Sequence, residues 1–217
     1  MTTIREQSSK VKETAAQQLP SDVLEVFDRS IQDLVNEGVS GDAIAVGDEL
    51  PAFTLDDATG GRVSLDQILE TGPAVIVFYR GGWCPYCNLA LRTYQTDLLP
   101  RLGNFNARLI AISPQSPDES LSTAEKADLD FTVLSDPGAR LAYEVGIAFR
   151  QPDDVVAAQA ALGLHLASVN ADGALSLPRP AVLIVDPDRI VRFVDIQPDY
   201  TARTEVPDIV AALESLG

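Results

Sequence analysis

The chain has only two cysteines, Cys84 and Cys87, and they are separated by just two residues. Thiols at this spacing can close a local disulfide or supply half of a metal site. They follow an apolar, β-branched run at 74–79 and begin a predicted helix that extends from about residue 85 to residue 99. Unpaired N–H groups and the positive end of the helix dipole favour a thiolate at a helix start. The position therefore predicts thiol redox chemistry.

The neighbouring residues fit this interpretation. Pro85 suits the first helical turn, where its missing N–H costs nothing. Gly81 and Gly82 allow a tight turn before the helix and leave a cysteine accessible. A structural zinc site takes four ligands, and the remaining obvious candidate ligand, His165, lies about eighty residues away. We therefore expect a redox pair that needs no metal, and we expect His165 to be a structural or surface residue.

The elements around the motif alternate between strands and helices, which is typical of an α/β fold with a mainly parallel sheet. Apolar runs predict strands at 74–79, 109–112 and 131–134. Each strand is followed by a predicted helix, at 85–99, 117–127 and 136–145. Two further runs, 181–185 and 190–194, flank the turn residues Asp-Pro-Asp-Arg and predict a β-hairpin, which makes the sheet mixed.

The remaining segments are assigned from local signals. A short hairpin is expected from 53 to 65, followed by a short helix capped at Ser64 or Asp66. A terminal helix is expected at 207–216, with proline in its first turn. Residues 148–178 predict only a possible helix near 153–162 and a loop.

The segment before the domain contains an amphipathic helix. Residues 1–20 are polar with weak periodicity, and a helix is expected from Ser21 until Gly38 ends it. Its apolar positions share one face: Val23, Phe27, Ile31, Leu34 and Val35. We expect this face to cover the core or to contact a second subunit in a homodimer. The chain is accordingly divided into an N-terminal helical extension, 1–44, and a domain, 45–217.

The segment FYRGGWCPYC at 78–87 resembles the thioredoxin superfamily, in particular the peroxiredoxin-like members of the AhpC/TSA family. Similar resemblances lie in GDELPAFTL at 47–55, LSDP at 134–137 and LPRPA at 177–181. The resemblance implies a thioredoxin fold with a central mixed sheet flanked by helices. In that superfamily the last of these segments carries a cis-proline. We therefore expect a cis bond between Arg179 and Pro180, close to the cysteines.

Two family patterns overlap on the motif. The peroxiredoxin pattern Pro-x-x-x-Thr-x-x-Cys places Arg80 at its proline, Cys84 at its threonine and Cys87 at its peroxide-attacking cysteine. The thioredoxin pattern Trp-Cys-x-x-Cys is completed by Trp83 and makes Cys84 the attacking thiol of disulfides. Cys87 lies on the apolar stripe of its helix, so Cys84 is expected to be the more exposed and more acidic thiol. The order of attack stays open.

The resemblance implies a thiol peroxidase that reduces hydrogen peroxide or organic hydroperoxides. One cysteine would become a sulfenic acid, the other would form a disulfide with it, and a thioredoxin-like or other thiol reductant would reduce that disulfide. A thiol-disulfide oxidoreductase and a non-enzymatic redox sensor are the alternatives. The candidate catalytic residues are Cys84, Cys87 and Arg80. The candidate substrate-pocket residues are Trp83, Pro85, Tyr86, Arg179 and Pro180.

Composition narrows the class of protein. The 217 residues predict one domain, and 46% hydrophobic with 22% charged residues is ordinary for a globular protein. The net charge of −16 disfavours binding to nucleic acids and to anionic membranes. The first residues lack the apolar region of a secretory signal, and the apolar runs are too short to span a membrane. We expect a cytoplasmic protein.

Overall fold

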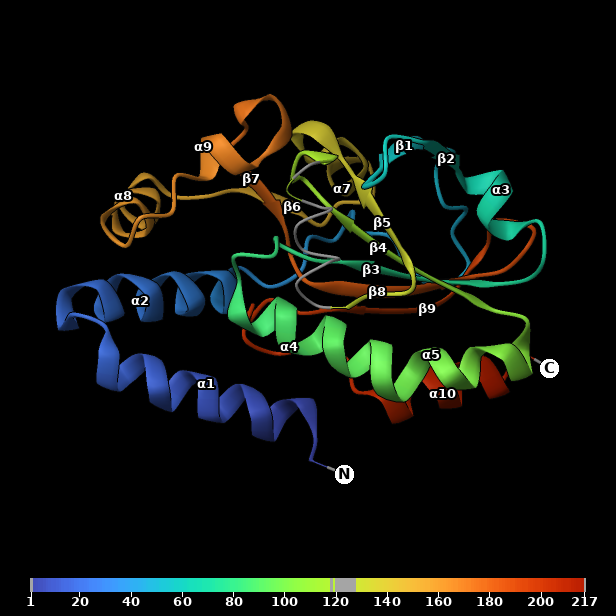
Figure 1. Cartoon of the computed structure of the whole chain (residues 1–217), viewed down its shortest axis with the longest axis horizontal. Coiled ribbons are helices and arrows are strands. Elements are labelled where there is room, and N and C mark those ends of the chain that lie inside the picture. Colours follow the sequence, from blue (N-terminus) through green and yellow to red (C-terminus); the bar gives the residue numbers. More distant parts are fainter. Residues whose placement is uncertain (1, 118, 120–127, 217) are drawn as a thin grey trace.

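A seven-stranded mixed sheet forms the centre of the computed structural model, which describes residues 2–117, 119 and 128–216. Helices cover both faces of the sheet (Figure 1). The strand order is β2-β1-β5-β4-β3-β8-β9. The strands are β1 (Thr54–Asp57), β2 (Arg62–Ser64), β3 (Ala74–Phe78), β4 (Arg108–Ser113), β5 (Thr132–Ser135), β8 (Ala181–Val185) and β9 (Val191–Ile196).

The central strand β3 lies between a parallel and an antiparallel neighbour. Ile76 pairs with Ile110 of the parallel strand β4 and with Leu183 of the antiparallel strand β8. Every residue of β3 is buried, as expected for a central strand covered on both faces. The predicted mixed sheet and the predicted hairpins β1–β2 and β8–β9 are confirmed.

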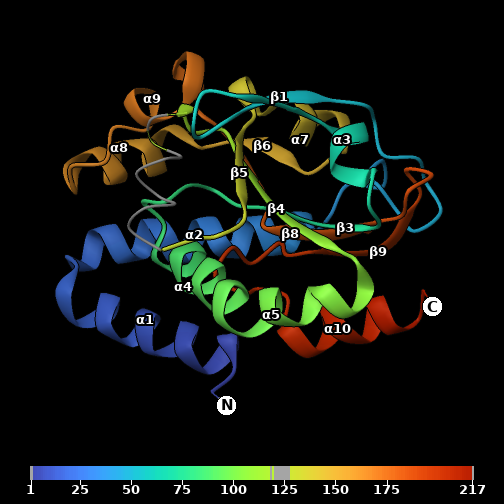
Figure 2. The same cartoon turned by 45° about the vertical axis from the view of Figure 1, so that its right-hand side comes forward.

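Alternate side chains of β3 enter two separate apolar clusters. Val75 and Val77 pack with the helices of one face, and Ile76 and Phe78 pack with those of the other. The two helical layers are visible in Figure 2. The first layer contains α4 (Pro85–Thr93), α5 (Leu99–Leu102) and α10 (Val206–Glu214), and the second contains α3 (Leu65–Leu69) and α7 (Arg140–Glu144).

The helix after the cysteines is longer than predicted. Between α4 and α5 the chain forms one π-helical segment, Tyr94–Leu98, in which the Leu99 N–H donates to the Tyr94 carbonyl. Pro100 follows at the start of α5 and has no N–H to donate, which favours this local change of helix. The core stripe is nevertheless maintained, because Cys87, Leu91, Tyr94 and Leu98 are all fully buried.

Two helices precede the sheet, α1 (Ile4–Gln18) and α2 (Ser21–Glu37). The second was predicted, and the first was not. Thr3 and Glu6 form a capping box at the start of α1. The Glu205 carboxylate also accepts hydrogen bonds from the N–H of Ile4 at 3.0 Å and of Arg5 at 2.9 Å. Ile4 is 1% exposed and joins the core cluster, so α1 is packed on the domain.

Residues 148–178, for which the sequence predicted least, form an insertion of short helices and strands on the second face of the sheet. It contains the predicted helix as α8 (Asp153–Ala161), a short helix α9 (Leu166–Val169), and a two-stranded sheet of β6 (Ala148–Arg150) and β7 (Ser176–Pro178). α8 contacts α2. His165 is exposed at the start of α9, as expected.

The remaining expectations concern the helix at 117–127 and the absence of a membrane-spanning segment. The helix expected at 117–127 lies, apart from residues 117 and 119, outside the described residues. Among the helices of the described residues, none has the length and apolar character needed to cross a membrane.

Candidate active site

The two cysteines lie where β3 turns into α4. Cys84 is the N-cap of α4 and Pro85 occupies its first turn, as predicted. The turn depends on Gly81, whose φ is +147° and which packs so closely on Trp83 that a Cβ would lie 2.4 Å from the indole nitrogen. Gln115 accepts a hydrogen bond from the Gly82 N–H at 2.7 Å and fixes the turn to the next loop.

Both thiols are reduced and buried. Cys84 is 1% exposed and Cys87 is 0% exposed. Cys84 was predicted to be the more exposed thiol; it borders the larger cavity, but the difference in exposure is slight because both thiols are buried. α1, α2 and α8 contribute side chains around this end of α4 and enclose the thiol, and no motif in the sequence indicated that they would do so.

An arginine from the far end of the chain contacts both sulfur atoms. The Nη2 atom of Arg203 lies 3.1 Å from Sγ of Cys87 and 3.9 Å from Sγ of Cys84. Its Nη1 atom donates to the backbone carbonyls of Tyr200 and Ala202, which hold the guanidinium in place. A partly buried guanidinium needs such partners, and a thiolate is the partner with the opposite charge.

The surroundings give the two thiols different acidities. Burial raises the pKa of Cys87, but four effects outweigh it and hold this pKa well below its usual range: the Cys84 hydrogen bond, the Arg203 charge, the Arg80 backbone N–H and the Arg80 charge. Burial raises the pKa of Cys84 well above its usual range, and its hydrogen bond to the negative Cys87 raises it further. The prediction that Cys84 is the more acidic thiol is therefore wrong.

The side chain of Arg80 lies on the other side of Cys84. It is 3% exposed, and its guanidinium carbon lies 5.1 Å from the ring centre of Trp83 and 3.9 Å from that of Tyr200. Arg80 thus lowers the pKa of Cys87 through its backbone N–H and through its charge, and its guanidinium also lines the cavity beside two aromatic rings.

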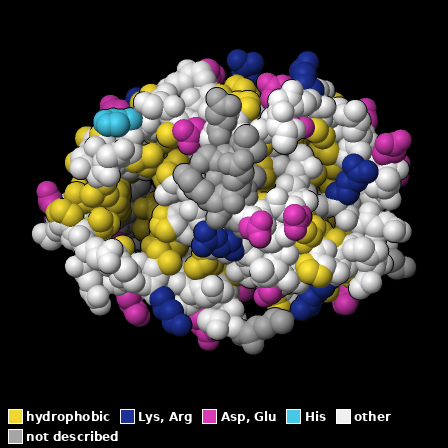
Figure 3. Space-filling view, in the orientation of Figure 1, with side chains coloured by type: hydrophobic (Ala, Val, Ile, Leu, Met, Phe, Trp, Pro, Cys, Tyr) yellow, Lys and Arg dark blue, Asp and Glu magenta, His cyan; other side chains and the backbone are white. Residues whose placement is uncertain are grey.

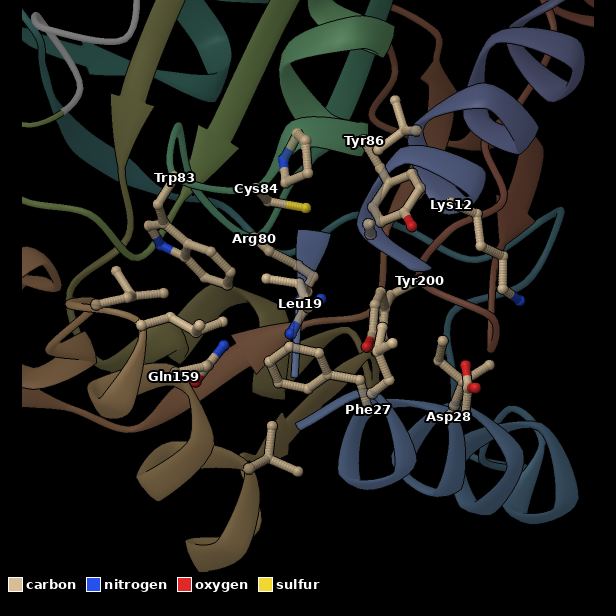
Figure 4. A pocket seen from close by; sticks show the side chains of 18 of the residues that line it. Lys12, Leu19, Phe27, Asp28, Arg80, Trp83, Cys84, Tyr86, Gln159 and Tyr200 are labelled. Atoms are coloured by element: carbon tan, nitrogen blue, oxygen red, sulfur yellow. The ribbon is translucent and has the colours of Figure 1, made fainter. Parts of the chain in front are cut away.

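Cys84 lies at one end of a cavity of about 390 Å³. Figure 4 shows its sulfur directed inward and Phe27 of α2 on the opposite side. On the surface, apolar side chains gather around a recess (Figure 3). The cavity brings together five of the predicted site residues, which are Arg80, Trp83, Cys84, Pro85 and Tyr86. Burial raises the pKa of Tyr86 to about 12, so its hydroxyl stays protonated.

The other two pocket candidates lie elsewhere. Pro180 borders a cavity of only about 10 Å³ beside Cys87 and Arg203. Arg179 lines a third cavity, where it pairs with Glu37 at 2.7 Å and lies over the ring of Phe149. The structure thus does not bring Arg179 to the cysteines.

The expected cis bond between Arg179 and Pro180 is also wrong. The bond is trans, and no cis peptide bond occurs among the residues that the structure describes. The Arg179 N–H donates to the Ile147 carbonyl and the Pro180 carbonyl accepts from Gln197, so the link is held extended on both sides. Trans is also the intrinsically preferred form.

Residues 46–194 match the sequence model of a family described as the AhpC/TSA family. The chain belongs to the AhpC/TSA family. The matched span includes both cysteines and Arg80, and it ends before Arg203. No sequence signal identified Arg203, because it lies in the link between the last strand and the terminal helix, in a segment without a motif.

Known members of the AhpC/TSA family resemble the chain in part. It is 31% identical over 104 residues to the chloroplastic peroxiredoxin Q of Gentiana triflora, covering 48% of this chain and 47% of the relative. The chain thus spans about half the length of the curated relatives it matches.

The likeness to solved structures is wider. The peroxidoxin BcpB from Mycobacterium tuberculosis has a TM-score of 0.63 at 22% identity, with 80% of this chain and 99% of that chain covered. AhpC of Enterococcus faecalis has a TM-score of 0.61 at 19% identity, covering 79% and 91%. These likenesses show the fold, and the predicted thioredoxin fold is confirmed.

Proposed function

We propose that the chain is a thiol peroxidase that reduces hydrogen peroxide or organic hydroperoxides through Cys84 and Cys87. The observation that carries the proposal is the contact of Arg203 with Cys87, which keeps one thiol of the pair as a thiolate. A thiolate is the nucleophile that cleaves a peroxide bond, and a neutral thiol beside it can supply the proton that the leaving oxygen needs in the first step.

In the first step the Cys87 thiolate attacks one peroxide oxygen. The S–O bond forms, the O–O bond breaks, and the released alkoxide or hydroxide takes the proton of the Cys84 thiol. Sulfur is oxidised to sulfenic acid while the peroxide is reduced to an alcohol or water. The Cys84–Cys87 hydrogen bond places that proton donor beside the reacting sulfur.

In the second step the Cys84 thiolate attacks the sulfenic sulfur. The S–S bond forms, and hydroxide leaves and is protonated to water. A thiol reductant then returns both cysteines to the reduced form by exchange. We propose a thioredoxin-like protein as this reductant and the cytoplasm as the compartment, since cytosolic thiols are kept reduced.

The proposed site assigns a role to each remaining candidate. Arg80 stabilises the Cys87 thiolate through its backbone N–H and presents its guanidinium to the incoming peroxide. Trp83 and Tyr86 form walls of the cavity, Pro85 starts the helix, and Pro180 closes the small space behind Cys87. The division into an N-terminal extension, 1–44, and a domain, 45–217, remains a prediction. Assembly of the chain into a homodimer also remains a prediction.

A second function, thiol-disulfide exchange, is favoured by one observation. Cys84 borders the cavity of about 390 Å³, whereas Cys87 borders only the small one. A partner disulfide would therefore meet Cys84 first, and the Trp-Cys-x-x-Cys pattern belongs to proteins that attack in this order.

Two assays separate these functions. The reduced protein is given hydrogen peroxide or cumene hydroperoxide with dithiothreitol as reductant, and peroxide loss is followed. In parallel, dithiothreitol-driven reduction of insulin is followed by turbidity. Peroxide turnover without insulin reduction is the expected result. Insulin reduction alone would assign the second function, and failure of both would indicate a redox sensor without turnover.

A further inference from the structure

The cavity at Cys84 has walls from two parts of the chain. Trp83, Cys84 and Tyr86 belong to the part that matches the AhpC/TSA family. The opposite walls come from α1 and α2, which precede residue 46 and lie outside the matched span. The additional helices therefore build a compartment beside Cys84, the hydrogen-bond partner of the attacking Cys87.

The added walls are mainly apolar, with Lys12 of α1 and Asp28 of α2 as their charged members. α2 contributes Leu24, Phe27 and Ile31, and the end of α1 is followed by Leu19. All four side chains are only partly buried, so they retain surface that a ligand can cover. A cavity of about 390 Å³ with this lining is of the size that holds small organic ligands. Hydrogen peroxide needs no such volume and gains nothing from apolar walls.

The cysteine end of the cavity is polar. Arg80 lies there between Trp83 and Tyr200, and no carboxylate among the described residues is in ion-pair contact with it. A buried guanidinium without a carboxylate attracts electron-rich oxygen. The lining thus fits a molecule with an apolar body and an oxygen-bearing head directed at Cys84 and Arg80.

We propose that this cavity binds the apolar body of an organic hydroperoxide, and that α1 and α2 give the enzyme its preference for such substrates over hydrogen peroxide. The inference rests on the proposed function. The alkyl or aryl group lies against Phe27 and Ile31, and the O–O group lies at the Arg80 end, beside the cysteine pair.

Cavity variants test the preference. In Ile31→Gln the apolar wall becomes polar, and kcat/KM for cumene hydroperoxide should fall about tenfold or more while kcat/KM for hydrogen peroxide changes less than about twofold. Val35→Gln is the matched control, since Val35 lies on the same helix, is 44% exposed and does not line the cavity. It should leave both values unchanged. Equal losses for both peroxides, or no loss for cumene hydroperoxide, would overturn the proposal.

A second variant guards against a folding defect. Ala15→Phe adds a ring inside the cavity without removing a packed side chain, and Ala15 is a lining residue of α1. It should produce the same selective loss as Ile31→Gln at an unchanged melting temperature. An Ala15→Phe protein that keeps its full preference for cumene hydroperoxide would contradict the proposal.

Binding can be measured without turnover. Trp83 is the only tryptophan of the chain and lines the cavity, so its fluorescence reports occupancy. Titration with 2-phenyl-2-propanol, the alcohol from cumene hydroperoxide, should give a saturable change in the wild type and in Val35→Gln. Ile31→Gln should bind about tenfold more weakly. Saturable binding in a protein that consumes neither peroxide would refute the peroxidase function and leave the cavity as an apolar binding site. Absence of saturable binding would refute the cavity assignment itself.

Discussion

The guanidinium of Arg203 lies 3.1 Å from the sulfur of Cys87, although 116 positions separate the two residues. This hydrogen bond joins the segment before α10 to the first turn of α4. Arg203 adds a second positive charge beside Cys87 to that of Arg80, which lies in the family-matched part of the chain. The reactivity of the cysteine pair thus depends on a contact outside the matched span.

Replacing Arg203 should suppress the first chemical step. In Arg203→Met, Cys87 loses a charge-assisted hydrogen bond of about 1.5–3 kcal/mol. The acid dissociation constant of Cys87 should then fall roughly 10- to 100-fold, and the thiolate population and the bimolecular rate with hydrogen peroxide at neutral pH should fall with it. Stopped-flow peroxide loss and the thiolate absorbance near 240 nm measure the two effects.

Arg179→Met provides the comparison, because Arg179 is a buried arginine that pairs with Glu37 in another cavity. Its peroxide rate should stay close to that of the wild type. Arg203→Lys should recover part of the rate, since it keeps the charge. A low peroxide rate in Arg179→Met together with a normal rate in Arg203→Met would show that Arg179, the arginine suggested by the sequence, activates the cysteine in place of Arg203.

The pH dependence follows from the opposite shifts of the two thiols. The pKa of Cys87 is lowered, so its thiolate persists as pH falls below about 8.5, where an ordinary cysteine becomes protonated. The peroxide rate should therefore be flat across neutral pH and decline only at more acidic pH. In Arg203→Met the decline should begin at higher pH. An unchanged profile in the variant would exclude Arg203 as the cause.

Mild oxidation should join the two cysteines. Their thiols are already in hydrogen-bond contact, so the sulfenic acid has its partner beside it. After one equivalent of peroxide the intact mass should fall by two hydrogens, and peptide mapping should link Cys84 to Cys87. Persistent free thiols, or a sulfinic acid at either position, would contradict the proposed second step.

The single cysteine variants assign the attacking thiol. A stoichiometric burst of peroxide loss should survive in Cys84→Ser and end as a sulfenic acid at Cys87, because Arg203 still contacts Cys87. It should be absent in Cys87→Ser. Both variants should lack sustained turnover. A burst found only in Cys87→Ser would transfer the attack to Cys84 and favour disulfide exchange.

The N-terminal helix should contribute measurably to stability. Ile4→Ala removes a side chain that is 1% exposed and packed in the main core cluster, which should cost about 2–5 kcal/mol of unfolding free energy. Urea unfolding measures this loss. Deletion of residues 1–38 should lower the melting temperature as well. An unchanged midpoint in both would mean that α1 does not pack on the core.

The sequence predicted those parts of the site that depend on local signals. The strand β3, the helix start at Pro85 and the core position of Cys87 follow from β-branched residues, proline preference and helical periodicity. The hairpin β8–β9 follows from its turn residues. The helix α1 was missed, because its sequence is mostly polar and it is anchored by Ile4 and by the distant Glu205.

The acidity of the thiols could not be predicted in this way. Periodicity and the helix dipole concern residues close in sequence, and they favoured Cys84. The deciding charge, Arg203, and the burial of Cys84 by α1 and α2 arise only from tertiary packing.

Cys87 and Arg203 are far apart in sequence, so they are synthesised at different times. Cys87 leaves the ribosome 116 residues ahead of the arginine that activates it. Glu205, which binds the start of α1, is made later still. Throughout this interval Cys87 is an ordinary thiol, mostly protonated at neutral pH. We therefore expect Cys87 to gain its full reactivity only when folding brings Arg203 to it.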